Sequence, residues 1–176
     1  MHRINAIIVG AGPAGAACAW ALRRRGVECL LLDREKFPRL KLCGGLLTPE
    51  ALDDLEFDVG DYPHSHFTIE RFCFHYRNRQ LTLKSPQHSI RRVEFDDWLM
   101  TRSGVGLHRH YVRSIVRDGD YFVIDDAYRC RYLIGAGGTR CPVYRSFFRD
   151  LAPRDPELQI SVLEEEFPYN LSLIHI

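Results

Sequence analysis

Three glycines in one short segment have the spacing of a phosphate-binding turn. Gly10, Gly12 and Gly15 form the pattern G-x-G-x-x-G, with Pro13 and Ala14 between the last two glycines. The pattern follows an apolar run rich in branched residues and precedes small apolar residues at helical spacing. In this context the first glycine permits a tight turn, the second lets backbone N–H groups approach a pyrophosphate, and the third lets helix and strand pack closely.

An acidic residue stands where a dinucleotide site needs one. Asp33 follows a second apolar segment, 27–32, so that residues 4–33 are typical of a β-α-β unit. Its carboxylate can accept hydrogen bonds from both ribose hydroxyls, and its charge repels a 2′-phosphate. The helix N-terminus adds partial positive charge toward the phosphates. The alternative is a glycine turn in an unrelated α/β fold, which this spacing disfavours.

FAD and NAD share this fingerprint, so the rest of the chain must decide between them. After an irregular stretch, the sequence patterns predict strands within 66–84, a helix at 90–102, a hairpin at 107–125 and a buried strand at 132–134. A late strand with a glycine-rich end that returns to the first sheet suits FAD bound in an extended form. We therefore expect an α/β fold: a Rossmann-like FAD-binding βαβ domain with an inserted antiparallel β region.

Several motifs extend this interpretation. They are Asp33-Arg34, the segment 37–49 with Lys41-x-Cys43-Gly44-Gly45, the segment Arg92-x-x-Phe95-Asp96-x-Trp98-Leu99, and Leu133-Ile134-Gly135-Ala136-Gly137-Gly138. Together they resemble the geranylgeranyl reductase-like family of FAD-dependent oxidoreductases, which has the p-hydroxybenzoate hydroxylase type of fold. The resemblance covers about residues 4 to 145.

The resemblance implies a role for each matching position. The ADP half of FAD would be held by Gly10, Gly12, Gly15 and Asp33, and the FAD phosphates would contact Arg92. The other residues expected to bind the cofactor in this part of the chain are Pro13, Ala14, Arg34 and Lys41. The turn at Gly135, Gly137 and Gly138 would lie beside the ADP part, and Val112, in the strand before the hairpin turn, would meet the adenine through its backbone. Relatives often carry aspartate where this chain has Gly137, so no polar role is expected there.

Cys43 has two readings. The Cys43-Gly44-Gly45 turn would lie near the isoalloxazine ring, where the thiol could assist hydride and proton transfer and Lys41 could lower its pKa. Alternatively, Cys43 is a small residue that fills a tight turn.

The resemblance implies that the whole protein is an FAD-dependent oxidoreductase. It would take electrons from NAD(P)H or ferredoxin and reduce carbon–carbon double bonds of an isoprenoid or similar lipid. The alternatives are a flavin-dependent monooxygenase of the same fold and a non-catalytic nucleotide-binding fragment.

Charge and composition restrict the classes of partner that we expect for this protein. A formal net charge of +1 lacks the positive field that nucleic-acid binding needs. The uncharged stretch 6–22 is interrupted by glycine and proline, which argues against a membrane span or signal peptide. The two His-x-His pairs have no third ligand, so no metal site is expected. We expect a cytoplasmic protein that acts on a small molecule or lipid, with peripheral membrane contact possible in the full-length protein.

The C-terminal end suggests a shortened chain. The last six residues, 171–176, back-translate into a string resembling a sequencing-library adapter, and the downstream Gly-Asp motif of the family is absent. We expect a discontinuous FAD-binding domain at 1–150, with 60–90 contributing to an antiparallel substrate-side region. Residues 151–170 would begin a truncated substrate domain, and the fragment would be inactive alone.

Overall fold

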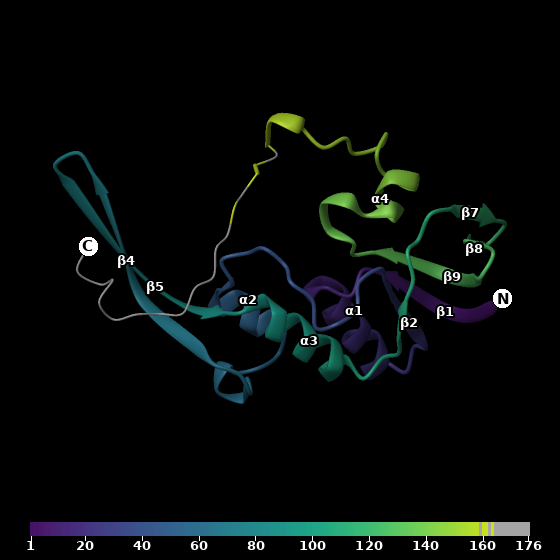
Figure 1. The fold of residues 1–176 in the computed structure, drawn as a ribbon, viewed down its shortest axis with the longest axis horizontal. Coiled ribbons are helices and arrows are strands. Elements are labelled where there is room, and N and C mark those ends of the chain that lie inside the picture. The colour runs from purple at the N-terminus through teal and green to yellow at the C-terminus, as the bar shows by residue number, and fades with distance from the viewer. Residues whose placement is uncertain (159, 162, 164–176) are drawn as a thin grey trace.

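The computed structural model describes residues 1–158, 160, 161 and 163. Within these residues the chain forms a six-stranded sheet, in the order β6-β2-β1-β9-β8-β7, and a three-stranded sheet, in the order β3-β5-β4 (Figure 1). The strands are β1 (His2–Val9), β2 (Cys29–Asp33), β3 (Leu46–Leu47), β4 (His66–Tyr76), β5 (Arg79–Ile90), β6 (Leu107–Arg109), β7 (Ile115–Asp118), β8 (Tyr121–Ile124) and β9 (Tyr128–Gly135). The α-helices are α1 (Pro13–Arg24), α2 (Pro49–Asp54), α3 (Arg92–Ser103) and α4 (Pro142–Phe147), and the short 3₁₀ turns are η1 (Val59–Asp61), η2 (Gly138–Arg140) and η3 (Pro156–Leu158).

Strands β1, β2, β6 and β9 run parallel, so their carboxyl ends meet at one edge of the main sheet. Ile7 of β1 is paired with Leu30 of β2 on one side and with Leu133 of β9 on the other. The predicted β-α-β unit is confirmed, with α1 as its connection. In open parallel sheets, ligands bind beyond this carboxyl edge.

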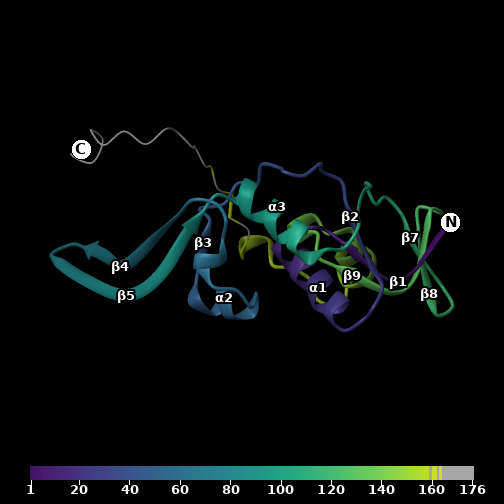
Figure 2. The ribbon, with the colours of Figure 1, turned by 90° about the horizontal axis from the view of Figure 1, so that it is seen from below.

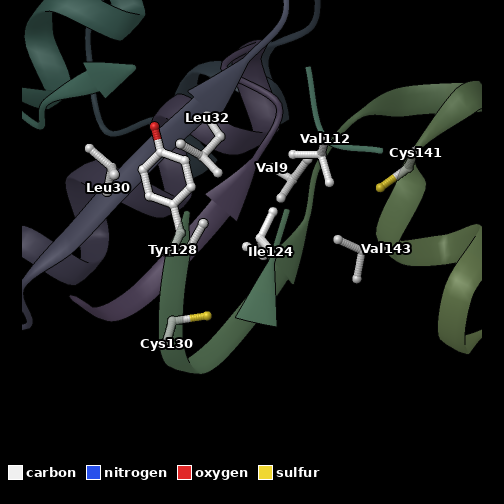
Figure 3. Packing of buried hydrophobic residues seen from close by; sticks show 10 residues of the cluster. Val9, Leu30, Leu32, Val112, Ile124, Tyr128, Cys130, Cys141 and Val143 are labelled. Carbon is white, nitrogen blue, oxygen red and sulfur yellow. The ribbon is translucent and has the colours of Figure 1, made fainter. Parts of the chain in front are cut away.

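The two faces of the main sheet carry different cores. Ile8 and Leu31 are fully buried together with Ala19 of α1, whose small side chains let the helix lie close to the strands. Helix α3 packs beside α1 (Figure 1). On the opposite face Val9, Leu30 and Leu32 form a cluster with residues of β8, β9 and α4 (Figure 3). Because adjacent strand residues point to opposite faces, a short apolar run serves both cores.

Strands β4 and β5 form a long hairpin that projects away from the main sheet in both ribbon views (Figures 1 and 2). One face of this arm is apolar: Phe74 is paired with Leu81 and Phe72 with Leu83. Phe74 and Leu81 are 53% and 58% exposed. The opposite face pairs Cys73 with Thr82. The arm therefore presents an apolar surface that the described residues leave open.

The hairpin predicted at 107–125 is wrong in its first part. Leu107 begins β6, which pairs in parallel with Leu31 of β2 at the edge of the main sheet. Helix α3 supplies the crossover that a parallel neighbour requires. The hairpin itself is confined to β7 and β8, with Asp118 paired to Tyr121 across the predicted turn.

Some predictions fall outside the described residues. The adapter-like segment 171–176 does so entirely, and the expected start of a substrate domain at 151–170 does so at residues 159, 162 and 164–170. Among the described residues, no helix is long and apolar enough to cross a membrane. In that same part of the chain, no three His, Cys, Asp or Glu side chains gather where they could hold a metal ion.

Candidate functional site

The glycine turn lies at the carboxyl end of β1, directly before α1. Gly10 has φ +109°, and a Cβ there would collide with the carbonyl oxygen of Ala136. A Cβ at Gly15 would collide with the carbonyl oxygen of Gly10. At Gly12, by contrast, a Cβ would meet only the Nη2 atom of Arg39, at 3.3 Å. Two glycines are thus required by packing, while the third leaves the backbone accessible to a ligand.

The same turn provides the N-terminus of a twelve-residue helix. Gly12 is the N-cap of α1 and Pro13 occupies the first turn, and no side chain caps the helix. The first N–H groups of a helix have no partner within it and carry partial positive charge. An anion at this position would accept hydrogen bonds from these N–H groups and would be attracted by their partial positive charge.

Asp33 connects the end of β2 to the glycine turn. Its Oδ2 atom accepts a hydrogen bond of 2.8 Å from the backbone N–H of Ala11, and its Oδ1 atom accepts one of 2.9 Å from the backbone N–H of Glu35. Each carboxylate oxygen has further lone pairs, so both can still accept a hydrogen bond from a ribose hydroxyl. The neighbouring Arg34 is exposed and forms an ion pair with Glu35.

A buried carboxylate between two arginines lies beside the glycine turn. Asp96 of α3 is fully buried, and Arg92 binds it through two hydrogen bonds, Nε to Oδ1 at 2.7 Å and Nη2 to Oδ2 at 2.9 Å. The Nη2 atom of Arg39 lies 3.1 Å from Oδ2 of the same carboxylate. Burial by itself lowers the pKa of Arg92, but the hydrogen bond and charge of Asp96, with a contact to Cys43, outweigh it and raise the pKa.

The Cys43-Gly44-Gly45 turn is joined to the end of β5 through Gly45. Gly45 is buried with φ +65°, and its carbonyl oxygen accepts a 2.9 Å hydrogen bond from Ile90 at the end of β5. Cys43 and Gly44 are exposed. Arg92 is a cation in contact with the Cys43 thiol, and the expected effect of Lys41, whose side chain is exposed, stays a prediction.

The turn after β9 lies against the glycine turn. The N–H of Ala136 donates to the carbonyl oxygen of Val9 at 2.8 Å. A Cβ at Gly135 would lie 2.8 Å from Cβ of Val143, and a Cβ at Gly137 would lie 3.0 Å from Cα of Cys141. These two glycines are explained by packing against the start of α4.

Gly138 differs from its neighbours in the turn. It has φ +67°, and no atom lies within 4 Å of a Cβ built on it. The positive φ, and not a lack of space for a side chain, therefore explains why glycine stands at position 138.

Val112 was predicted in a strand, and this prediction is wrong. It lies in the connection between β6 and β7, because β6 ends at Arg109. Its side chain is 5% exposed and points into the same core as Val9 (Figure 3). The burial of the side chain leaves only the backbone available to a ligand at this position.

Comparisons with known proteins agree with this arrangement. Residues 8–71 match a family model described as an NAD(P)-binding Rossmann-like domain. A menaquinone reductase of Mycobacterium tuberculosis is 30% identical over 168 residues, which cover 82% of this chain and 40% of that protein. A geranylgeranyl diphosphate reductase of Rhodobacter capsulatus is 42% identical over 105 residues, which cover 58% of this chain and 26% of that protein.

The resemblance to FAD-dependent oxidoreductases is confirmed. The predicted Rossmann-like α/β fold is confirmed as well: the halogenase PltM, solved in complex with phloroglucinol and FAD, matches with a TM-score of 0.65 at 20% identity, over 81% of this chain and 36% of that one. The chain spans about 40% or less of the length of the relatives it matches.

Sequence reasoning missed two residues of the candidate FAD site. Asp96 was noted only as part of a motif, although its spacing from Arg92 places the two side chains on one helix face. Arg39 lies in a stretch without regular structure, and no periodicity marks it. Its position against Gly12 depends on a carboxylate on α3, far along the chain, which spacing could not indicate.

Proposed function

We propose that the chain binds FAD in an extended form across the carboxyl ends of β1, β2 and β9. One observation supports this most: a continuous line of neighbouring groups runs from Asp33 through the glycine turn and the arginine–carboxylate cluster to Cys43. Along this line an acid suited to a ribose comes first, an open backbone suited to a pyrophosphate comes second, and an exposed turn suited to the flavin comes last. The ribose, pyrophosphate and flavin follow each other in the same order along FAD.

The residues along this line fit the cofactor. Gly12 and the N-terminus of α1 would hold the pyrophosphate, and Asp33 the adenosine ribose, as the resemblance implies for both. When bound, FAD supplies the two-electron chemistry of such proteins. The chain's own part is to bind and orient it, with the thiol of Cys43 at the far end of the line, where it can hold a proton beside the flavin ring.

We further propose that the whole protein reduces carbon–carbon double bonds of an isoprenoid or similar lipid, with NAD(P)H or ferredoxin as electron donor. The names of two relatives support this, since both are reductases and one acts on geranylgeranyl diphosphate. Residues 1–150 would form the FAD-binding domain, to which residues 60–90, including the β4–β5 arm, add a substrate-side region. The apolar face of that arm suits a substrate of this class.

Cofactor binding is tested by titrating the chain with ADP and with FAD. Gly12→Ala is the diagnostic variant, because its Cβ would meet only the flexible end of Arg39 and the fold should survive. We expect weaker binding of both ligands. Gly106→Ala is the matched control, since its Cβ would meet Leu30 at an ordinary 3.6 Å. Lack of ADP and FAD binding by the unsubstituted chain would refute the proposal.

The reaction is tested on the full-length protein with a polyprenyl substrate and mass analysis of the product. A product that has gained two hydrogen atoms per double bond supports the reductase. A product that has gained an oxygen atom, with consumption of O₂, identifies a monooxygenase instead. A protein that binds FAD tightly but turns over neither way would be a nucleotide-binding module.

A further inference from the structure

We infer that Arg39 supplies the guanidinium that contacts the diphosphate, and that Asp96 is the residue that positions it. This inference rests on the proposed FAD site and deepens it. It changes the expectation from the resemblance, which gave the phosphate contact to Arg92. The reason lies in how the two arginines share one buried carboxylate.

Arg92 is committed to the protein interior. Its Nε and Nη2 atoms both bind Asp96, in the paired geometry that a guanidinium and a carboxylate prefer, and it also contacts Cys43. The side chain is only 16% exposed. Its donors are therefore largely used before a ligand arrives.

Arg39 has a different set of contacts. It meets Asp96 through Nη2 alone, and its guanidinium carbon lies 5.0 Å from the ring centre of Phe37. The same Nη2 atom lies 3.3 Å from where a Cβ of Gly12 would stand. The guanidinium thus lies beside the one position of the glycine turn that the fold leaves open, at the N-terminus of α1.

The charges of the cluster favour an anion at this point. Two guanidinium groups share one carboxylate, and Arg92 already holds both oxygens of Asp96. Arg39 is 15% exposed, so water solvates its charge only in part. Buried charges are normally paired. A diphosphate lying over Gly12 would give the charge of Arg39 a second anionic partner. Its oxygens would accept hydrogen bonds from the planar N–H groups of the guanidinium.

The test measures binding of ADP and of adenosine to the chain by calorimetry, together with thermal unfolding. Arg39→Gln should weaken ADP binding about tenfold to one-hundredfold, because a charge-assisted hydrogen bond is lost. Adenosine binding should be unchanged, since adenosine has no phosphate. Because Arg92 still pairs with Asp96, the melting temperature should change little.

Three comparisons make the result decisive. Arg39→Lys keeps a positive charge but lacks the planar set of guanidinium donors, so it should retain part of the ADP affinity. Arg92→Gln removes the two hydrogen bonds from Arg92 to the buried carboxylate of Asp96 and should clearly lower the melting temperature. Arg117→Gln, on the distant strand β7, is the matched control and should bind ADP normally.

Two outcomes would contradict the inference in different ways. If Arg39→Gln binds ADP as tightly as the unsubstituted chain, Arg39 is not the diphosphate ligand, while the FAD site itself stands. If the unsubstituted chain binds neither ADP nor FAD, the proposed function fails, and the assignment of Arg39 fails with it.

Discussion

The backbone N–H of Ala11 and the carboxylate of Asp33 are joined by a hydrogen bond of 2.8 Å, which ties the glycine turn to the end of β2. The residue that would bind the ribose also fixes the loop that would bind the phosphates. Substitution of Asp33 should therefore act on both.

We expect Asp33→Asn to weaken ADP binding and to narrow the preference for ADP over ADP carrying a 2′-phosphate. The amide removes the negative charge that repels the extra phosphate, yet it can still accept a hydrogen bond from Ala11. Competition binding with the two nucleotides measures the change. Asp118→Asn, whose ion-pair partner Arg129 lies on β9, serves as the control. An unchanged ratio of affinities would argue against a ribose at Asp33.

Stability should fall in acid through Asp125. Burial raises the pKa of this carboxyl, but hydrogen bonds from the backbone of Ser114, from His110 and from the backbone of Arg113 outweigh it, and the pKa lies below its usual 3.8. Because the folded-state pKa is depressed, the stabilisation is present above the unfolded-state pKa and disappears as the pH falls through the folded-state value.

Asp125→Asn tests this. The amide suits the positive φ of 48° at this position but carries no charge. We expect it to lower the free energy of unfolding by about 1–2 kcal/mol at neutral pH, and the difference from the unsubstituted chain to vanish in strong acid. Urea denaturation at a series of pH values measures both. A deficit that stays constant down to pH 2 would exclude the charge as its cause.

The cysteines should react unequally with iodoacetamide. Burial raises the pKa of Cys130 to about 11, and its side chain is 1% exposed, so it should remain unmodified in the folded chain. Cys43 and Cys73 are exposed and should both react. Added FAD should protect Cys43 but not Cys73, whereas ADP should protect neither, because it lacks the flavin. Peptide mass analysis gives the rates. Equal labelling of Cys43 with and without bound FAD would place the flavin elsewhere.

The apolar face of the β4–β5 arm should govern self-association. Leu81→Lys should change the free energy of unfolding by no more than about 0.5 kcal/mol, because the side chain is largely exposed, and should reduce association at high protein concentration. Thr82→Lys, on the other face of the same strand, should leave association unchanged. Sedimentation velocity and urea denaturation provide the two measurements. A large loss of stability in Leu81→Lys would mean that the apolar face is packed within the chain.

Local signals in the sequence were sufficient for the β-α-β unit. Glycines at 10, 12 and 15 followed an apolar strand and preceded a helix of small residues, and each of these features acts within a few residues of the turn. The β7–β8 turn was likewise recognisable from Gly119 between two aspartates.

Contacts between distant segments were not predictable in the same way. The pairing of Leu107 with Leu31 depends on α3 as a crossover, and a short apolar run looks alike in a hairpin and at a parallel sheet edge. The position of Arg39 depends on the burial of Asp96 in another element. Periodicity reports which face a residue occupies within its own element, but it does not report which element lies opposite.

The central position of β1 in the sheet also determines the order in which its two edges can pair during synthesis of the chain. One edge of β1 pairs with β2, which follows almost at once in the chain, while the other edge pairs with β9 at residues 128–135. A nascent chain therefore carries an open strand edge until most of the described residues have left the ribosome. Since Gly10 rests against Ala136, the nucleotide turn is completed only at that moment. Nucleotide binding at this turn would then have to follow the synthesis of β9, and until that point the open edge of β1 can pair with another strand.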